Sequence, residues 1–103
     1  MLLSTNGQNI FPEEIEAVLN ELQYVAESLV VMRNGNLHSI IVPDGNAMAE
    51  NGIDANTMNA IMDENISYLN SQIPKYSAVS SYELRFEPFA KTPKGSIKRF
   101  MYV

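Results

Sequence analysis

The feature that most constrains the fold is a pair of β-rich runs, residues 28–33 and 37–43, separated by Asn34-Gly35-Asn36. Branched apolar residues dominate both runs. Asn-Gly is a strong hairpin signal because both residues adopt the positive φ angles that a tight turn requires. The sequence therefore predicts a β-hairpin near the middle of the chain.

We expect one amphipathic helix before this hairpin in the sequence and one after it. The first covers residues 12–22, since Pro12 suits a first helical position and two glutamates follow it in the first turn. The second covers residues 55–73 and is stopped by Pro74. Its apolar residues recur at helical spacing, so this helix should cover one face of the sheet: Met58, Ile61, Met62, Ile66, Leu69 and Ile73.

The remaining segments complete an α+β interpretation. Residues 44–54 read as a loop or a broken helical turn, and residues 81–87 alternate as a half-buried strand with Tyr82, Leu84 and Phe86 on one face. An exposed basic loop should follow, leading into a short element at residues 97–102, and residues 1–9 can add a β-strand or hairpin. The sum is a single domain, residues 1–103, with a small mixed β-sheet of βαββαβ-like order and two main helices.

Composition excludes several classes of function. The formal net charge is -5, which argues against nucleic-acid binding because that binding depends on clustered Lys and Arg. There is no cysteine, hence no disulfide or thiolate metal site, and no apolar run is long enough to span a bilayer. The charge is unevenly distributed, however. Four cations near the C-terminus can form a local positive face: Lys91, Lys94, Lys98 and Arg99.

The chain contains no complete active site by motif. Phosphate-binding, dinucleotide-binding and zinc-protease signatures are all missing, and no metal site is predicted. The single histidine, His38, lies on an expected strand and is given no role. The glutamates Glu13, Glu14 and Glu16 are interpreted as solvated charges at a helix start.

Two segments together resemble a known family. They read GQNIFPEEIE (residues 7–16), which fits Gly-x-x-Ile-x-Pro-x-Glu-Ile-Glu, and KTPKGSIKR (residues 91–99). Their order and separation resemble the mobile C-terminal lid domain of acyl-adenylate-forming enzymes, the AMP-dependent synthetase and ligase family. The tail Lys98-Arg99-Phe100 makes the chain most similar to long-chain fatty-acid-CoA ligases.

The resemblance assigns roles to the basic segment. In the family, a lysine here reaches the ATP site and stabilises the charge that develops as the carboxylate attacks ATP and pyrophosphate leaves. Alignment on Gly95 places Ser96 at the position of that lysine, and serine carries no charge. Lys98 is the first candidate to supply the ammonium group instead and Lys94 the second, with Arg99 as phosphate-facing support.

The resemblance also implies that the first segment, residues 7–16, acts in the second half-reaction, in which the acyl group is transferred to CoA. In the family the domain swings so that this loop faces the active site and lines the channel for the pantetheine arm. Gly7 suits close backbone approach to a thin ligand because it lacks a Cβ atom. Gln8 and Asn9 are candidate polar contacts in the same channel.

The resemblance also implies a larger enzyme around this chain. Its partner would be a large N-terminal adenylation domain of the same polypeptide, its substrates fatty acid, ATP and CoA, and its metal Mg²⁺. The isolated domain is expected to be inactive and to bind no ATP, Mg²⁺ or CoA. We also expect the enzyme to be cytoplasmic, with any contact to a membrane made through the large domain. Two rivals remain open: a free-standing small-ligand or regulatory α+β module, and more weakly a nucleic-acid-binding module.

Overall fold

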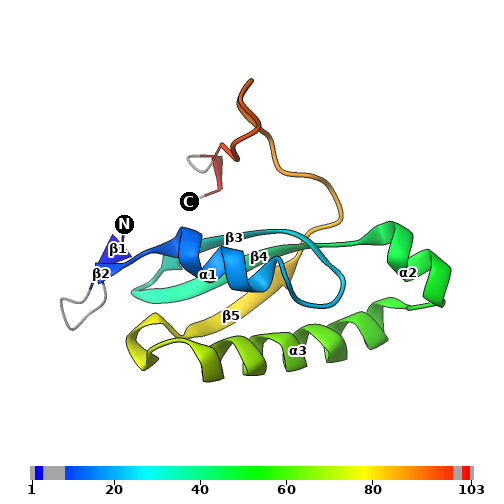
Figure 1. The fold of residues 1–103 in the computed structure, drawn as a ribbon, viewed down its shortest axis with the longest axis horizontal. Helices are drawn as coiled ribbons and strands as arrows, with labels where there is room; N and C mark the ends of the chain where they lie inside the picture. The colour runs from blue at the N-terminus through cyan, green and yellow to red at the C-terminus, as the bar shows by residue number, and fades with distance from the viewer. Residues whose placement is uncertain (1, 4–8, 99–100, 103) are drawn as a thin grey trace.

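The computed structural model describes residues 2–3, 9–98 and 101–102, and Figure 1 shows their arrangement. Gly7, Gln8 and Arg99 lie outside the described residues. The elements in chain order are β1 (Leu2–Leu3), β2 (Asn9–Ile10), α1 (Pro12–Leu19), β3 (Val25–Arg33), β4 (Asn36–Pro43), α2 (Gly45–Asn51), α3 (Ala55–Gln72), the 3₁₀ turn η1 (Lys75–Ser77) and β5 (Val79–Leu84).

A three-stranded mixed sheet in the order β3-β4-β5 forms the centre of the domain. β3 and β4 are antiparallel and joined at Asn34 and Gly35, whose φ angles are 53° and 80°. The predicted hairpin is therefore confirmed. Asn34 and Gly35 suit the tight turn because both residues adopt the positive φ angles that it requires. β5 pairs in parallel with β4 after the long crossover through α3.

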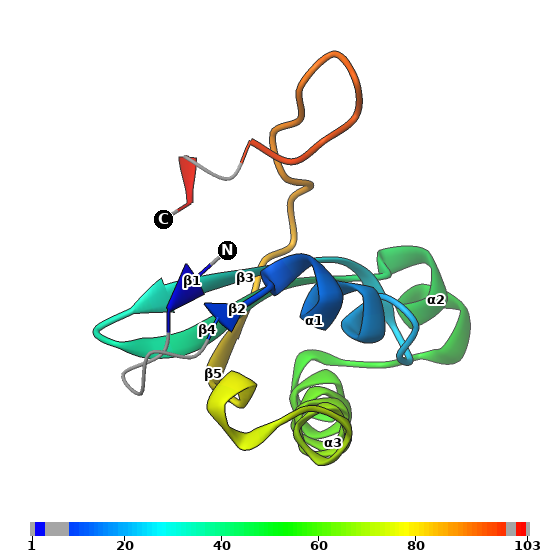
Figure 2. The same cartoon turned by 60° about the vertical axis from the view of Figure 1, so that its left-hand side comes forward.

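One face of the sheet is covered by α1 and α3 (Figure 2). Ile15 and Leu19 of α1 reach the apolar side chains of β3, and Met62 and Leu69 of α3 are fully buried beneath them. The Tyr82 hydroxyl, on β5, donates to the Asp63 carboxylate of α3 at 2.6 Å. Burial and the neighbouring Asp63 together raise the pKa of Tyr82 to about 12. The predicted covering of a sheet face by the second helix is confirmed.

The opposite face of the sheet is covered by the C-terminal segment. Leu29 and Val31 of β3 and Ile40 and Val42 of β4 form a second apolar cluster, with Phe89 packed on it. Burial on both faces explains why these two strands read as nearly continuous apolar runs instead of alternating ones.

The N-terminal pair of strands is separate from the central sheet. Leu2 pairs with Ile10 and Leu3 with Asn9 in antiparallel register, so the predicted N-terminal hairpin is confirmed. This hairpin forms its own two-stranded sheet. The first β element of the βαββαβ-like order thus lies beside the main sheet and leaves it with three strands.

Several predicted boundaries were wrong. α1 ends at Leu19 and not at residue 22, because the chain turns there and reaches a positive φ of 62° at Tyr24 before β3 begins. Residues 45–51 form helix α2, capped by Asp44, whose carboxylate accepts from the Ala47 amide at 3.1 Å. β5 ends at Leu84, so Phe86 lies beyond the strand and is 63% exposed instead of buried.

Candidate functional site

The basic C-terminal segment folds into a small hairpin, here called the basic hairpin (residues 90–98). Lys91 and Ile97 form an antiparallel bridge. The Thr92 amide donates to the Ser96 carbonyl at 2.7 Å, and the Lys98 amide donates to the Ala90 carbonyl at 2.8 Å. The predicted exposed loop is thus an ordered turn with backbone hydrogen bonds at its base and near its tip.

The turn of the basic hairpin follows from its residue types. Pro93 sets the first central φ, and the Gly95 amide donates to the Thr92 carbonyl at 2.9 Å to close the turn. Gly95 then takes a φ of 87°, and a Cβ there would meet nothing within 4 Å. Glycine is therefore required for its backbone conformation and not for space, as in hairpins with a bulge after the turn.

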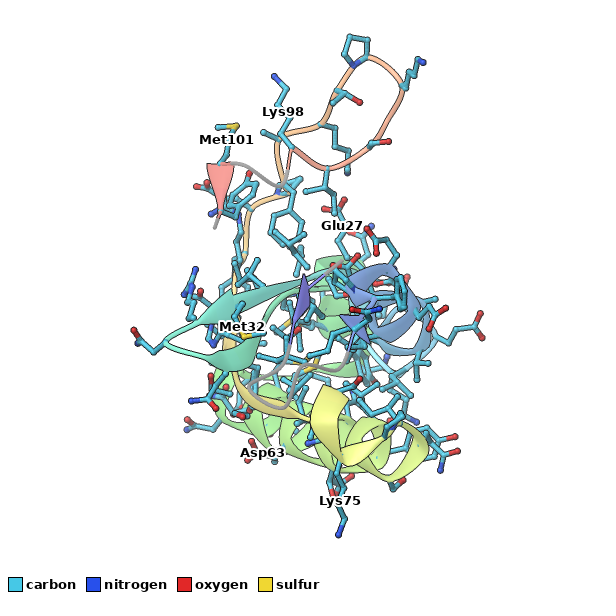
Figure 3. The ribbon with its side chains drawn as sticks, turned by 90° about the vertical axis from the view of Figure 1, so that its left-hand side faces the viewer. Glu27, Met32, Asp63, Lys75, Lys98 and Met101 are labelled. Atoms are coloured by element: carbon cyan, nitrogen blue, oxygen red, sulfur yellow. The ribbon has the colours of Figure 1, made fainter. Side chains whose placement is uncertain are left out.

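The three candidate residues of the basic hairpin differ in exposure. Lys94 and Ser96 are exposed near the turn, and Lys98 is half-buried at the base of the second arm. Figure 3 shows Lys98 on the far side of the central sheet from Lys75, with its side chain directed away from the protein. Among the described carboxylates, none lies within ion-pair distance of the Lys94 or Lys98 ammonium group. Both cations are thus available to an anionic group from outside the domain.

Lys91, the other lysine of the hairpin, is already paired. Its ammonium group contacts the Glu27 carboxylate of β3. Lys91 therefore differs from Lys94 and Lys98 in having a carboxylate partner within the domain. The local positive face predicted from four cations therefore rests, among the described residues, on Lys94 and Lys98.

Aromatic contacts fix the base of the basic hairpin to the sheet. The rings of Phe89 and Tyr102 meet edge to face with centroids 5.0 Å apart, and the Arg85 guanidinium lies 5.1 Å from the Tyr102 centroid. The Tyr102 hydroxyl accepts from the Ala90 amide at 2.7 Å. Such contacts add to the burial of Phe89, so the hairpin projects from a firmly packed base.

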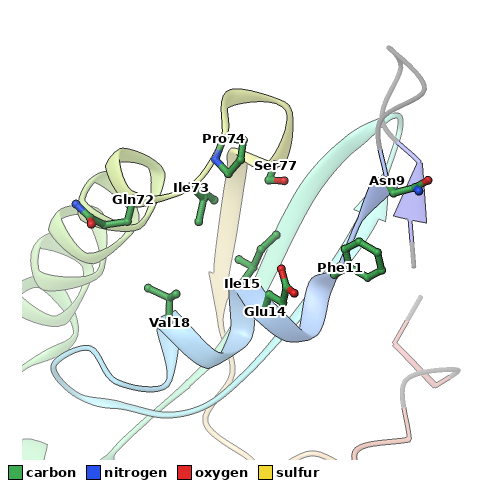
Figure 4. A pocket seen from close by; sticks show the side chains of 9 residues that line it. All are labelled: Asn9, Phe11, Glu14, Ile15, Val18, Gln72, Ile73, Pro74 and Ser77. Atoms are coloured by element: carbon green, nitrogen blue, oxygen red, sulfur yellow. The ribbon is translucent and has the colours of Figure 1, made fainter.

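The second group of candidate residues is represented by Asn9. It lines a groove of about 430 Å³ between the start of α1 and the Pro74 turn, together with Phe11 and Gln72 (Figure 4). The groove belongs to the helical layer, because Ile15 and Val18 of α1 also line it. Gly7 and Gln8 lie outside the described residues, so their predicted roles remain predictions.

The described members of the two groups of candidate residues lie on different layers of the domain. The basic hairpin is anchored on the sheet face that carries Phe89, whereas Asn9 lines a groove on the helical side. Lys94, Ser96 and Lys98 do not line that groove. Asn9 and the described residues of the basic hairpin therefore do not line one common pocket.

Glu16 has a structural role that the sequence prediction did not include. Its side chain is buried, at 6% exposure, and its Oε2 accepts from the Val30 amide of β3 at 2.7 Å. The interpretation of Glu16 as a solvated charge was wrong. The signal was present, since Glu16 shares the buried helical stripe with Pro12, Ile15 and Leu19.

A polar cluster joins β4 and β5 beside the C-terminal segment. The His38 ring lies 2.7 Å from the Ser81 hydroxyl and 3.1 Å from the Glu83 carboxylate, which also pairs with Arg33 at 3.1 Å. The hydrogen bond from His38, assisted by Arg33, holds the pKa of the Glu83 carboxyl below its ordinary value against the opposing effect of burial. Arg33 also donates to the Tyr102 carbonyl at 3.2 Å. His38 thus has structural partners, and the cluster ties the C-terminal segment to the sheet.

Two further findings limit the chemistry of the described residues. They include no group of three or more His, Asp or Glu side chains placed to hold a metal ion. In the same part of the chain, no helix is long and apolar enough to cross a membrane.

Solved structures share this fold. An acyl-CoA synthetase from Brucella canis superposes with a TM-score of 0.74 and 21% identity, over 98% of this chain and 18% of the other. The adenylation domain of a carboxylate reductase from Mycobacterium chelonae superposes with a TM-score of 0.81 and 13% identity, over 97% of this chain and 17% of the other. A fatty acyl CoA synthetase from Mycobacterium tuberculosis superposes with a TM-score of 0.70 and 21% identity, over 98% of this chain and 18% of the other. This chain spans less than a fifth of the length of these three proteins.

The likeness to these solved structures shows a shared fold. The family described as AMP-binding enzyme C-terminal domain matches residues 1–102. The chain belongs to this family, and the expected resemblance is confirmed. No curated protein sequence matches the chain significantly.

Proposed function

We propose that this chain is the mobile C-terminal domain of an ATP-dependent acyl-CoA ligase that acts on long-chain fatty acids. The parent enzyme would form an acyl-adenylate and pyrophosphate from a carboxylate and ATP, and would then transfer the acyl group to the thiol of CoA. The proposal is supported by the basic hairpin, which presents Lys94 and Lys98 from a firmly packed base in a member of this family. Neither ammonium group has an ion-pair partner among the described carboxylates.

The proposed role of the basic hairpin is electrostatic. Negative charge shifts onto the α-phosphate oxygens and the leaving pyrophosphate as the carboxylate oxygen attacks phosphorus. An ammonium group held at that point stabilises the transition state, typically by about 3 kcal/mol or two decades in rate. Lys98 is the first candidate because the backbone hydrogen bond from its amide to Ala90 fixes its Cα at the hairpin base. Lys94, at the turn, is the second.

ATP and Mg²⁺ are assigned mainly to the large domain that we propose accompanies this chain. The described residues lack a carboxylate cluster for the metal, and the sequence has no phosphate-binding loop. Mg²⁺ would neutralise phosphate charge when bound there. The residues of this domain would then add one positioned cation.

The proposed second role belongs to the opposite layer. Residues 7–9 would line the path of the pantetheine arm during thioester formation, and Asn9 lines a groove of about 430 Å³. Since the hairpin and this groove lie on different layers, each half-reaction would need its own orientation of the domain. The separation of the two groups supports a domain that alternates between two orientations.

The proposed long-chain specificity has separate support from the reaction class. It is favoured by the Lys98-Arg99-Phe100 tail and by the structural likeness to a fatty acyl CoA synthetase. The likeness to a carboxylate reductase points to a wider range of acids and acceptors within the same adenylating chemistry. Comparing rates with acids of different chain length in the full-length enzyme tests this part directly.

The test of the proposed function separates the two half-reactions in the full-length enzyme. Lys98→Ala, Lys94→Ala and the double variant are compared with Lys75→Ala, an exposed lysine on the opposite side of the domain (Figure 3). We expect pyrophosphate release to fall about a hundredfold in at least the double variant, while thioester formation from preformed acyl-adenylate changes little. Lys75→Ala should leave both rates unchanged. Wild-type adenylation in the double variant would refute the role of the basic hairpin.

A further inference from the structure

Glu27 of β3 contacts the base of the basic hairpin through both carboxylate oxygens. Oε1 contacts the Lys91 ammonium group, and Oε2 accepts from the Phe89 amide at 3.4 Å. The Glu27 side chain is only 19% exposed, so this interaction is partly shielded from solvent. One side chain thus holds two alternate residues of the arm that leads into the turn.

The contact is close to the candidate catalytic residues along the hairpin. Lys91 pairs across the hairpin with Ile97, the residue between Ser96 and Lys98. A shift of Lys91 relative to the sheet therefore moves the opposite arm with it. The positions of the Lys98 Cα atom and of the turn at residues 92–95 therefore depend on where Glu27 holds the first arm of the hairpin.

An irregularity in β3 directs Glu27 toward the hairpin. The β3–β4 register shifts between Val25 and Glu27, which adds one residue to β3 at this point. Val25 packs in the cluster on the helical face, whereas Leu29, two residues after Glu27, packs in the cluster on the hairpin face. Without the extra residue, positions 25, 27 and 29 would share one face. The bulge therefore allows Val25 to face the helices while Glu27 faces the hairpin, a use that bulges commonly have.

We propose that Glu27 is a positioning residue for adenylation, acting through Lys91 on the basic hairpin. This inference rests on the proposed function of the hairpin. Glu27 contacts the Phe89 amide and the Lys91 ammonium group, so we assign it a positioning role and not a catalytic one. The packing of Phe89 against Tyr102 holds the segment on the sheet independently, so loss of Glu27 should loosen the hairpin without unfolding the domain.

The experiment uses the full-length enzyme and compares Glu27→Gln and Lys91→Met with the control Glu50→Gln, an exposed carboxylate on α2. Glu27→Gln keeps the size of the side chain and an acceptor for the Phe89 amide but removes the ion pair. We expect the kcat of adenylation to fall about tenfold in both variants, since a misplacement near 1 Å can cost up to a hundredfold. The KM for ATP and the rate of thioester formation from preformed acyl-adenylate should stay within about twofold, and Glu50→Gln should match the wild type.

Two further measurements separate positioning from a merely structural role. The double variant Glu27→Gln with Lys91→Met should be no slower than either single variant, because both remove the same ion pair. The exchanged pair, Glu27→Lys with Lys91→Glu, should recover part of the lost adenylation rate. Equal loss in both half-reactions, or independent losses that multiply in the double variant, would overturn the inference.

Failure of this inference is distinguishable from failure of the proposed function. If the Lys94→Ala and Lys98→Ala double variant adenylates slowly while Glu27→Gln adenylates at the wild-type rate, the hairpin is functional and Glu27 does not position it. If adenylation is unchanged in all of these variants, the proposed role of the hairpin is wrong and the inference fails with it.

Discussion

The buried Glu16 carboxylate offers the sharpest test of how this fold is held together. Its Oε2 accepts from the Val30 amide at 2.7 Å, at a side chain that is 6% exposed. Val30 lies on β3, which is an edge strand of the three-stranded sheet. The carboxylate thus satisfies a backbone donor that no neighbouring strand of this sheet is placed to satisfy, and it ties α1 to the sheet.

The expected cost of removing this carboxylate follows from its burial and charge. Glu16→Ala leaves the Val30 amide without its acceptor, and an unsatisfied buried donor costs about 1–3 kcal/mol. Glu16→Gln keeps an amide oxygen but exchanges a charge-assisted hydrogen bond for a neutral one, which is roughly half as strong. We therefore expect the free energy of unfolding to fall by about 2 kcal/mol in the alanine variant and by about 1 kcal/mol in the glutamine variant.

Urea unfolding of the 103-residue chain, followed by circular dichroism, measures both values. Glu14→Ala provides the matched control, because Glu14 lies on the same helix and is exposed. It should change stability by less than about 0.5 kcal/mol. Equal stability of the Glu16→Ala variant and the wild type would refute the reasoning, as would a glutamine variant that loses as much as the alanine variant.

Three other predictions concern the core, the acid limb of stability and the thioester step. Met62→Ala should cost about 2–5 kcal/mol by creating a cavity, whereas the exposed Met101→Ala should cost under about 0.5 kcal/mol in the same unfolding experiment. His38 and Arg33 lower the pKa of the Glu83 carboxyl in the folded state, so this group stabilises the fold at pH values above its unfolded-state pKa. That stability is lost as the pH falls through the lower folded-state pKa. The unfolding midpoint of Glu83→Gln should therefore decrease less than that of the wild type as the pH is lowered in this range. From the sequence alone, Gly7→Leu in the full-length enzyme should slow acyl-CoA formation while pyrophosphate release stays nearly intact, and equal loss in both would remove the assignment of Gly7.

The parts of the fold that could be predicted from the sequence are those with strong local signals. Asn34 and Gly35 specify their turn by backbone conformation, and α3 carries a long apolar stripe with Pro74 just beyond its end. The basic segment was also recognised as accessible, with Lys94 and Ser96 exposed. These features depend on neighbours in the chain or on simple periodicity, so a sequence pattern carries them.

The parts that escaped prediction depend on distant residues. The Glu27 carboxylate meets the Phe89 amide across 62 positions of sequence, and no local pattern indicates such a pair. Phe86 continues the alternation of β5 but lies past the last strand residue, where the chain leaves the sheet. Glu16 looked like its exposed neighbours because a charged residue type suggests solvent, while its position on the helix places it against β3.

The basic hairpin is proposed to supply a cation to the adenylation step, and Ser96 allows a direct test of this role. Only backbone atoms of Ser96 form the described hydrogen bonds, since its amide donates to the Thr92 hydroxyl at 3.2 Å and its carbonyl accepts from the Thr92 amide. A lysine side chain can therefore replace the serine without breaking the turn. Ser67, exposed on α3, provides a control position for an added lysine.

The decisive measurement is the rate of pyrophosphate release from fatty acid and ATP by the full-length enzyme. The Lys94→Ala and Lys98→Ala double variant is compared with the same variant carrying Ser96→Lys or, as the control, Ser67→Lys. We predict that Ser96→Lys restores at least tenfold of an approximately hundredfold loss and that Ser67→Lys restores nothing. Adenylation at the wild-type rate in the double variant, or equal rescue by both added lysines, would contradict it.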